Sequence, residues 1–269
     1  MSAFSTRVAA LTGVDEDSLE PLAGESLSEV LLVRRPNGAL AVAKSGPAVP
    51  VEAAMLRAIA AAGVPAPAVE AEHDGVLLLD YVENDAVFSP RAWADIGAQL
   101  RRLHERTGDF YGWPVDYLLG TVKLDNREAQ DWPAFWGEQR LVATASILDR
   151  PWRERVERLA ARLGELLPRA PRAALLHGDL WTGNILVRDG RLVGFVDPAC
   201  YYGHDEVDLA MLDLFSTPPD DFRNGFGPIE PGWRERQAVY QLFPALAHVR
   251  LWGQSYYGMV DRLLATLGF

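Results

Sequence analysis

Three polar residues in the second half of the chain have types and spacing that could carry out chemistry. Asp179 and Asn184 stand in the segment HGDLWTGN, and Asp197 follows the apolar run GFV. A carboxylate can orient an attacking hydroxyl group and accept its proton, and carboxylate and amide oxygens are ligands that suit Mg²⁺. The pattern predicts phosphoryl transfer, with Asp179 as the catalytic base and Asn184 and Asp197 as Mg²⁺ ligands. His177 is expected to form a structural hydrogen bond.

The sequence around these residues predicts a strand, a polar loop and a hairpin. The strand covers residues 174–177, and the two strands of the hairpin meet at Asp189-Gly190. This order resembles the HRDxxxxN and DFG segments of protein kinases, which present a base and two metal ligands. A single Asp or Asn more often caps a turn. The complete spacing, with apolar strands in the matching places, favours the catalytic interpretation.

A lysine and a glutamate farther upstream extend this resemblance. Lys44 ends the apolar strand ALAVAK, and Glu52 lies near the start of the helix that follows. In kinases a strand lysine reaches the nucleotide phosphates and a helix glutamate holds it. A lone lysine at a strand end is commonly a solvated surface residue. In this context we expect Lys44 and Glu52 to form the ion pair of an ATP site.

Two further segments are candidates for nucleotide contacts. The turn after residue 22 has one glycine where kinases usually have several, and its phosphate-binding candidates are Gly24, Ser26 and Ser28. A plain strand-to-strand turn explains that composition equally well. The strand ending near residue 82 would meet the adenine edge through backbone groups, which makes candidates of Asp80, Tyr81 and Val82.

The elements that must position these residues change from strands to helices along the chain. Strands are predicted at 31–35, 39–44, 69–72 and 76–82, with one helix at 51–62. Helices follow at 89–106, 132–148, 151–167, 206–215, 233–252 and 255–267. We predict an α+β, protein-kinase-like fold with two lobes. Residues 1–82 would form a nucleotide-binding lobe with a small antiparallel sheet, and residues 83–269 a larger, mainly helical lobe with the catalytic and substrate residues.

Composition limits the partners and the compartment. The formal charge of −11 repels a phosphate backbone, so nucleic acid is not an expected partner. Cys200 is the one cysteine, which excludes an intrachain disulfide. No stretch approaches the roughly 20 apolar residues of a membrane span. These features predict a cytoplasmic protein without a membrane partner, and they leave the oligomeric state open.

The acceptor of the phosphate is expected to be a small molecule. HGD replaces HRD, so the arginine with which protein kinases read a phosphorylated activation loop is absent. Few residues separate Asp197 from the helix that starts near Asp205-Glu206, which leaves no room for a long activation segment. A compact cleft for a metabolite fits this arrangement.

Longer segments make the resemblance specific. HGDLWTGN, DPACYYGHDEVDLAML, YQLFPALAHVRLWGQSY and YGWPVDYLLGTVKLDN resemble the fructosamine-3-kinase (ketosamine kinase) family, and the similarity covers most of residues 24–262. The resemblance implies ATP- and Mg²⁺-dependent phosphorylation of the 3-hydroxyl of a ketosamine, which would make the protein a deglycation enzyme. It leaves open which ketosamine is preferred and whether the substrate is free or protein-bound.

Trp181 lies two residues after the predicted base and is a candidate substrate residue, because its ring could stack on a sugar or cover the substrate amine. A packed core aromatic is the simpler alternative. For His248, Trp252 and the pair Tyr256-Tyr257, core packing is the commoner explanation, and a place on the pocket wall stays open for some of them.

Two other functions remain possible from the sequence. One is another kinase of the wider aminoglycoside phosphotransferase and choline kinase superfamily, acting on an amino sugar or amino alcohol with the same Asp179, Asn184 and Asp197. The other is a nucleotide-binding regulatory protein without catalysis. An intact Asp179 argues against the second, because binding alone needs no base.

Overall fold

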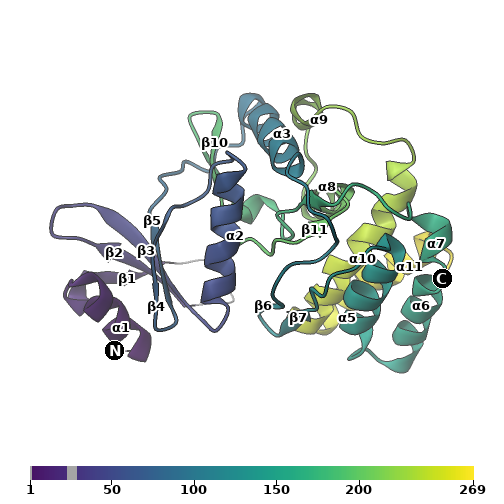
Figure 1. Ribbon diagram of the computed structural model, residues 1–269, viewed down its shortest axis with the longest axis horizontal. Coiled ribbons are helices and arrows are strands. Elements are labelled where there is room, and N and C mark those ends of the chain that lie inside the picture. The colour runs from purple at the N-terminus through teal and green to yellow at the C-terminus, as the bar shows by residue number, and fades with distance from the viewer. Residues whose placement is uncertain (1, 23–28) are drawn as a thin grey trace.

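The computed structural model of the protein describes residues 2–22 and 29–269. A five-stranded sheet with the helices α1 and α2 forms one part, and a larger helical part lies beside it (Figure 1). The α+β, protein-kinase-like class predicted from the sequence is confirmed by this architecture and by the solved structures described below. The division at residues 82 and 83 stays a prediction.

The sheet is antiparallel, in the order β1-β2-β3-β5-β4, and both of its faces are covered. Side chains alternate between the faces of a strand, so Ala43 and Leu78 pack under α1 while Leu77 and Leu79 pack under α2. The elements are α1 (Ala3–Thr12), η1 (Glu16–Ser18), β1 (Leu19–Pro21), β2 (Val30–Arg34), β3 (Leu40–Ser45), α2 (Val49–Ala61), β4 (Val69–His73) and β5 (Val76–Asp80).

Helix α1 was not predicted from the sequence. It is fixed by a capping box, in which the backbone N–H of Ser5 donates to the Ser2 hydroxyl (3.2 Å) and the N–H of Ser2 donates to the Ser5 hydroxyl (3.1 Å). Its buried side chains are Phe4 and Val8. So short an apolar stripe gives a weak helical pattern, which explains why the sequence did not reveal it.

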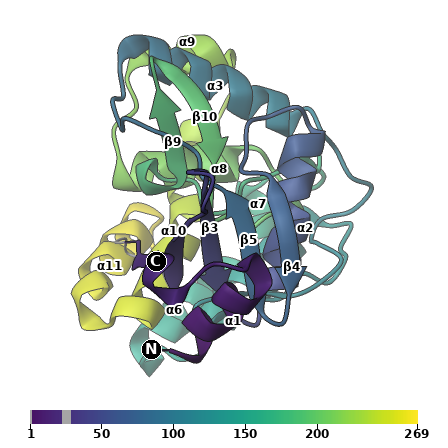
Figure 2. The same ribbon diagram turned by 90° about the vertical axis from the view of Figure 1, so that its left-hand side faces the viewer.

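A hairpin of the helical part lies against the sheet part. Strand β9 (Ile185–Arg188) pairs with β10 (Arg191–Phe195), and β10 contacts α3 (Pro90–His104) (Figure 2). The backbone N–H of Phe195 donates to the carbonyl of Pro65 (2.9 Å), so the end of this hairpin is tied to the loop between α2 and β4. This contact brings the residues that follow β10 close to the end of β3.

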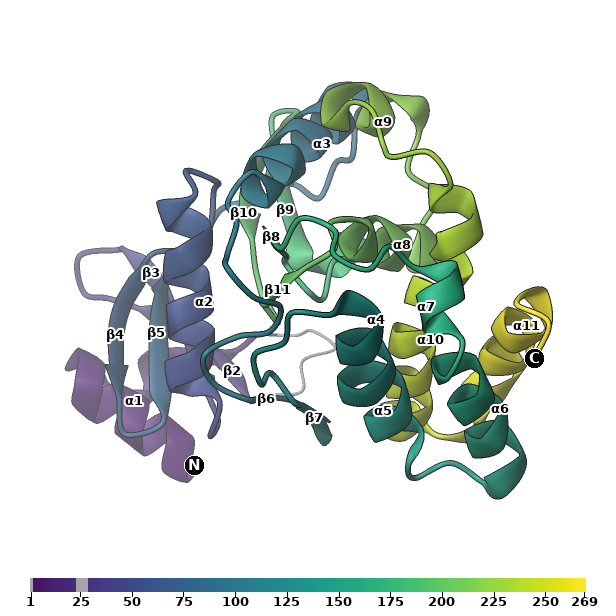
Figure 3. The same ribbon diagram turned by 45° about the vertical axis from the view of Figure 1, so that its right-hand side comes forward.

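The helical part contains the remaining elements (Figure 3). They are β6 (Tyr117–Leu119), β7 (Val122–Leu124), α4 (Trp132–Ala134), η2 (Phe135–Val142), α5 (Ala143–Ala145), α6 (Arg150–Ala160), α7 (Leu163–Leu166), β8 (Ala174–Leu175), η3 (Thr182–Asn184), β11 (Tyr202–Gly203), α8 (Glu206–Phe215), α9 (Asp220–Phe226), α10 (Trp233–Trp252), η4 (Gln254–Tyr256) and α11 (Tyr257–Thr266). The predicted helix 132–148 is present with a π-helical middle, whereas the predicted helix 151–167 is interrupted after Ala160. Strands β6 and β7 and helix α9 were not predicted.

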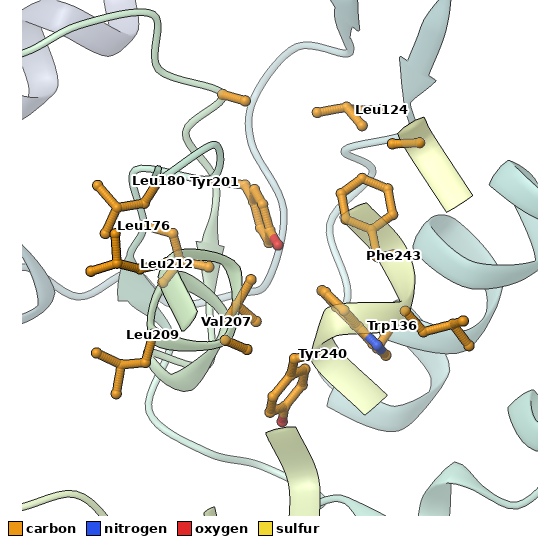
Figure 4. Close-up of a cluster of buried hydrophobic side chains, with 14 of the residues drawn as sticks. Leu124, Trp136, Leu176, Leu180, Tyr201, Val207, Leu209, Leu212, Tyr240 and Phe243 are labelled. Carbon is orange, nitrogen blue, oxygen red and sulfur yellow. The ribbon is translucent and has the colours of Figure 1, made fainter. Parts of the chain in front are cut away.

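The core of the helical part supports the loop that holds Asp179. Leu176 and Leu180, on either side of it, are fully buried and lie beside Leu209 and Leu212 of α8 (Figure 4). Trp136, Tyr240 and Phe243 lie opposite, on η2 and α10, in the same view. The burial of Leu176 and Leu180, which precede and follow Asp179 in the sequence, anchors the loop at both of its ends.

Candidate active site

Asp208 of α8 holds the backbone of the loop that precedes Asp179. Its carboxylate accepts hydrogen bonds from the N–H groups of His177 (2.8 Å) and Gly178 (2.9 Å) and from Nε2 of His104 (2.9 Å). Burial by itself would raise the pKa of Asp208. The hydrogen bond from His104 and the electrostatic attraction to the His104 ring hold this pKa below the ordinary value. A buried, ionised Asp208 therefore fixes the loop.

Only glycine fits without a steric clash at residue 178, the middle position of HGD. Gly178 has φ +82°, and a Cβ at this position would lie 2.1 Å from the carbonyl oxygen of Ala199. His177 donates from Nε2 to the carbonyl of Val196 (3.0 Å) and accepts from the N–H of Asp179 through Nδ1 (3.3 Å), as its predicted structural role requires. An arginine at residue 178 would not fit this backbone.

Asp179 and Asn184 are joined directly. The side-chain Nδ2 of Asn184 donates to the backbone carbonyl of Asp179 (2.8 Å) and to its Oδ2 (3.2 Å). Burial, reinforced by the negative charge of Asp197, raises the pKa of Asp179 to about 7. A carboxylate with a pKa near neutrality is suited to accept a proton from a hydroxyl group.

Lys44 connects the sheet part to the hairpin. Its Nζ lies 2.5 Å from Oε1 of Glu52 on α2 and 2.5 Å from Oδ1 of Asp197. Lys44 and Glu52 are buried, whereas the Asp197 side chain is 43% exposed. Burial would lower the pKa of Lys44, but the two carboxylates hold it above the ordinary value, so the ammonium stays charged.

Two oxygen atoms are available for a divalent cation. Asn184 uses its Nδ2 toward Asp179, and among the described residues its Oδ1 accepts no hydrogen bond. Oδ2 of Asp197 is equally without a donor in that part of the chain, since Lys44 binds Oδ1. Hard oxygen ligands of this kind fit Mg²⁺.

A second cluster of metal-competent groups, His204, Glu206 and Glu230, fits a cation poorly. Arg236 occupies both carboxylate oxygens of Glu206 (2.8 and 2.5 Å), and the Nδ1 of His204 is hydrogen-bonded to the Tyr240 hydroxyl (2.7 Å). Arg236 also brings its own positive charge into the cluster, so we assign no metal there.

Three cavities meet at the residues described above. The first, of about 440 Å³, lies between the sheet and β9, and Lys44 and the predicted candidates Asp80, Tyr81 and Val82 are on its wall. The second, of about 270 Å³, is polar and is bounded by Lys44, Glu52, Asp179, Asn184 and Asp197. The third, of about 310 Å³, runs from Asp179 into the helical part.

Trp181 borders all three cavities. Its ring lies over Gly183, where a Cβ would come within 2.2 Å of the ring atoms. The side chain therefore lies between the space beside the sheet and the space within the helices, and it is not a packed core aromatic. The predicted candidates Gly24, Ser26 and Ser28 lie outside the described residues.

The structure adds residues that the sequence analysis missed. Tyr117 of β6 borders the polar cavity, and its hydroxyl donates no hydrogen bond within the described ranges. Burial raises its pKa well above the ordinary value, and the charges of Glu52, Asp197 and Asp179 add to this rise. Tyr117 thus stays a protonated donor in the cavity that Asp179 and Asp197 also border. No local sequence signal marks it.

The wall of the third cavity includes residues for which the sequence favoured core packing. His248, Trp252 and Tyr256 follow the alternative that the sequence left open, because they line this cavity together with Phe215 and Phe243. An amphipathic helix that borders a cavity has the same apolar pattern as one that borders a core, so the sequence could not separate the two.

The chain is similar to known proteins over most of its length. The sequence profile of the family described as fructosamine kinase matches residues 43–267. The probable ketoamine kinase of Enterococcus faecium is 36% identical over 180 residues, a region that spans 63% of this chain and 65% of the relative.

Solved structures of other proteins are similar to this chain in fold. The crystal structure of a Thermobifida fusca protein named for fructosamine-3-kinase has a TM-score of 0.87 and 28% identity, with 98% of both chains covered. The amicoumacin kinase in complex with AMP-PNP and Ca²⁺ has a TM-score of 0.70 at 14% identity and covers 97% of this chain and 90% of its own, which shows a shared fold.

Proposed function

The chain belongs to the fructosamine kinase family, and from this premise we propose that it transfers the γ-phosphate of ATP to the 3-hydroxyl of small ketosamines. Family membership agrees with the class of enzyme predicted from the sequence, an ATP-dependent phosphotransferase. A role in deglycation and a location in the cytoplasm, where ATP is supplied, are parts of the same proposal. No helix in the described part of the chain has the length and apolar character needed to cross a bilayer.

One observation carries the proposal. Asp179 borders both the polar cavity, which contains Lys44, Asn184 and Asp197, and the cavity within the helices. A donor phosphate in the first and an acceptor hydroxyl in the second would meet at this carboxylate. Such an arrangement positions two substrates for direct transfer.

The chemistry is a displacement at phosphorus. The oxygen of the acceptor hydroxyl forms a bond to the γ-phosphorus, and Asp179 accepts the proton of that hydroxyl. At the same time the bond between the γ-phosphorus and the β,γ-bridging oxygen breaks, and ADP leaves. The raised pKa of Asp179 favours proton acceptance near neutral pH. Asn184, through its hydrogen bond to Oδ2, orients the carboxylate.

The other predicted residues would bind the nucleotide. Lys44, held by Glu52, would contact the phosphates, and the backbone of Asp80, Tyr81 and Val82 would border the adenine. Asn184 Oδ1 and Asp197 Oδ2 would hold Mg²⁺, which when bound supplies positive charge to the phosphate oxygens. The lobes 1–82 and 83–269 would thus bring the nucleotide and the acceptor together, with Trp181 between the two substrates.

The test is a substrate panel. Purified protein with Mg²⁺ and ATP would be assayed for ADP formation with ribulose- and fructose-derived amines, with choline and with an aminoglycoside. We expect turnover with ketosamines, and NMR of the product should show the phosphate on oxygen 3. Turnover confined to choline or the aminoglycoside would retain a kinase but discard the ketosamine assignment.

A further inference from the structure

Resting on the proposed function, we infer that the acceptor cavity selects ketosamines whose amine carries an apolar, preferably aromatic, substituent. Ketosamines of polyamines or of free amino acids would be poor substrates. The acceptor cavity is the space of about 310 Å³ that begins at Asp179 and is bounded by α8, α10 and η4. This volume lies at the lower end of what small-molecule sites occupy, so one compact substrate fills it.

The wall of the acceptor cavity is largely carbon. Its apolar and aromatic side chains include Leu119, Val207, Met211, Phe215, Phe243, Leu251, Trp252 and Tyr256. Among the described residues that line it, Asp179 is the one acidic side chain, and neither lysine nor arginine contributes. The chain carries a formal charge of −11, but the other acidic residues that the structure describes do not line this wall.

His248 does not add a charge to the wall. Its ring packs against those of Phe215 (4.5 Å between centroids) and Tyr256 (4.9 Å), and its Nδ1 donates to the carbonyl of Pro244 (2.8 Å). Burial lowers the pKa of His248, so the ring is neutral at neutral pH. The three packed rings therefore form an uncharged aromatic part of the cavity wall.

The chemistry of a ketosamine decides which of its groups meets this surface. The amine nitrogen is on carbon 1, two carbons from the carbon that carries the reacting hydroxyl. When that hydroxyl contacts Asp179, the ammonium must lie close to the same carboxylate and to the ring of Trp181, a favourable place for a cation. Asp179 thus serves the sugar end of the substrate, and the remaining cavity is left to the substituent on nitrogen.

Substituents that carry their own charge would lose free energy in this space. A second ammonium, as in a polyamine adduct, would be desolvated without a carboxylate partner, and a free carboxylate would be desolvated without a cation. A benzyl group, by contrast, gains from burial against Phe215, Trp252 and Tyr256. The same argument disfavours an aminoglycoside, whose several ammonium groups need several acidic partners.

The experiment compares ketosamines that share ribulose and differ only in the amine. The amines are benzylamine, glycine and spermidine, and kcat/KM is measured for each adduct with saturating ATP and Mg²⁺. We expect the benzylamine adduct to exceed the other two by about tenfold or more, the ratio that corresponds to about 1.4 kcal/mol.

Two sets of variants test whether residues of the cavity wall set the preference for an apolar substituent. Trp252→Ala removes a half-exposed ring of the wall and should lower kcat/KM for the benzylamine adduct about fivefold, a size typical of one aromatic contact. Its matched control is Trp93→Ala on α3, where the ring packs on Phe88 away from the acceptor cavity. Phe215→Asp should shift the preference toward the spermidine adduct, and Phe215→Asn, of equal size but uncharged, should not.

The outcomes separate the two proposals. If ketosamines are turned over but the glycine or spermidine adduct equals the benzylamine adduct, the selectivity is refuted and the proposed function stands. If no ketosamine is turned over, both are overturned. If Trp252→Ala does not fold, a shift in preference with Phe215→Asp and none with Phe215→Asn still decides whether the wall sets the preference.

Discussion

Glu52 offers a sharp test of how the nucleotide side of the site works. Its Oε1 lies 2.5 Å from Lys44 Nζ, and the same ammonium lies 2.5 Å from Oδ1 of Asp197. Substitution Glu52→Gln removes the charge but retains an oxygen that can accept a hydrogen bond. Of the two carboxylates that contact Lys44, only that of Asp197 would remain. Lys44 would then bind Asp197, a proposed Mg²⁺ ligand, more tightly.

The size of the effect follows from the burial of the pair. Breaking a buried ion pair typically costs about 3–5 kcal/mol of unfolding free energy when the remaining charge has no other partner. Here Asp197 remains and glutamine can still accept, so we expect a loss of about 1–2 kcal/mol, comparable with that of one charged hydrogen bond. For a chain of this size the melting temperature should fall by about 2–6 °C.

Glu52→Gln should also change the kinetics, in the KM for ATP and in the Mg²⁺ requirement. A shift of about 1–2 kcal/mol in favour of the contact between Lys44 and Asp197 corresponds to a five- to thirtyfold weaker apparent affinity for Mg²⁺-ATP. We expect KM for ATP to rise by about that factor, with a higher Mg²⁺ requirement and little change in KM for the acceptor. The assay is initial-rate kinetics over ATP and Mg²⁺ concentrations, with calorimetry for stability.

Glu72→Gln is the matched control, because Glu72 on β4 pairs with Arg57 of α2 (3.3 Å) at a more exposed position. It should leave both KM values unchanged. A Glu52→Gln variant with the Mg²⁺ and ATP dependence of the unmodified protein would refute the assigned role of the Lys44 pair.

Two further predictions follow from other groups. Tyr117→Phe removes the hydroxyl that borders the polar cavity and should lower kcat at least about tenfold without changing stability, the size of one hydrogen bond to a charged group; unchanged kcat would exclude contact with the reacting phosphate. Burial lowers the pKa of His204 from 6.5 to about 4, so the unfolded chain binds the proton first as pH falls. The contribution of neutral His204 to the free energy of unfolding is therefore complete above pH 6.5 and is lost as the pH falls to about 4. His204→Asn should reduce this loss, measured by urea unfolding at several pH values. An unaltered pH dependence would contradict the assignment.

The parts of the site that the sequence predicted depend on local spacing. Asp179 and Asn184 are five residues apart in one loop, and a single hairpin returns Asp197 to them. Lys44 and Glu52 are eight residues apart, across one turn between a strand and a helix. Such short connections leave little freedom of arrangement, so residue type and spacing were sufficient to predict these neighbours.

The rest depends on contacts between distant segments. Tyr117 reaches the polar cavity on the β6–β7 hairpin, and the chain beyond this hairpin is tied to buried Arg140, which donates to the carbonyl of Asp125 (2.6 Å) and to Oδ1 of Asn126 (2.7 Å). The acceptor wall combines side chains from α8, α10 and η4, whose apolar patterns resemble those of core helices. Only the packing of these elements decides which apolar side chains face a cavity.

The most direct test of the account is the single change Asp179→Asn, measured with a ketosamine that the unmodified protein turns over. We predict that ketosamine-dependent ADP formation falls by at least about 100-fold, since general base catalysis contributes 10²–10⁴-fold, while the dissociation constant for Mg²⁺-ATP and the melting temperature stay close to those of the unmodified protein. Turnover retained within a few fold would contradict the role of Asp179 as the base between the nucleotide and the acceptor.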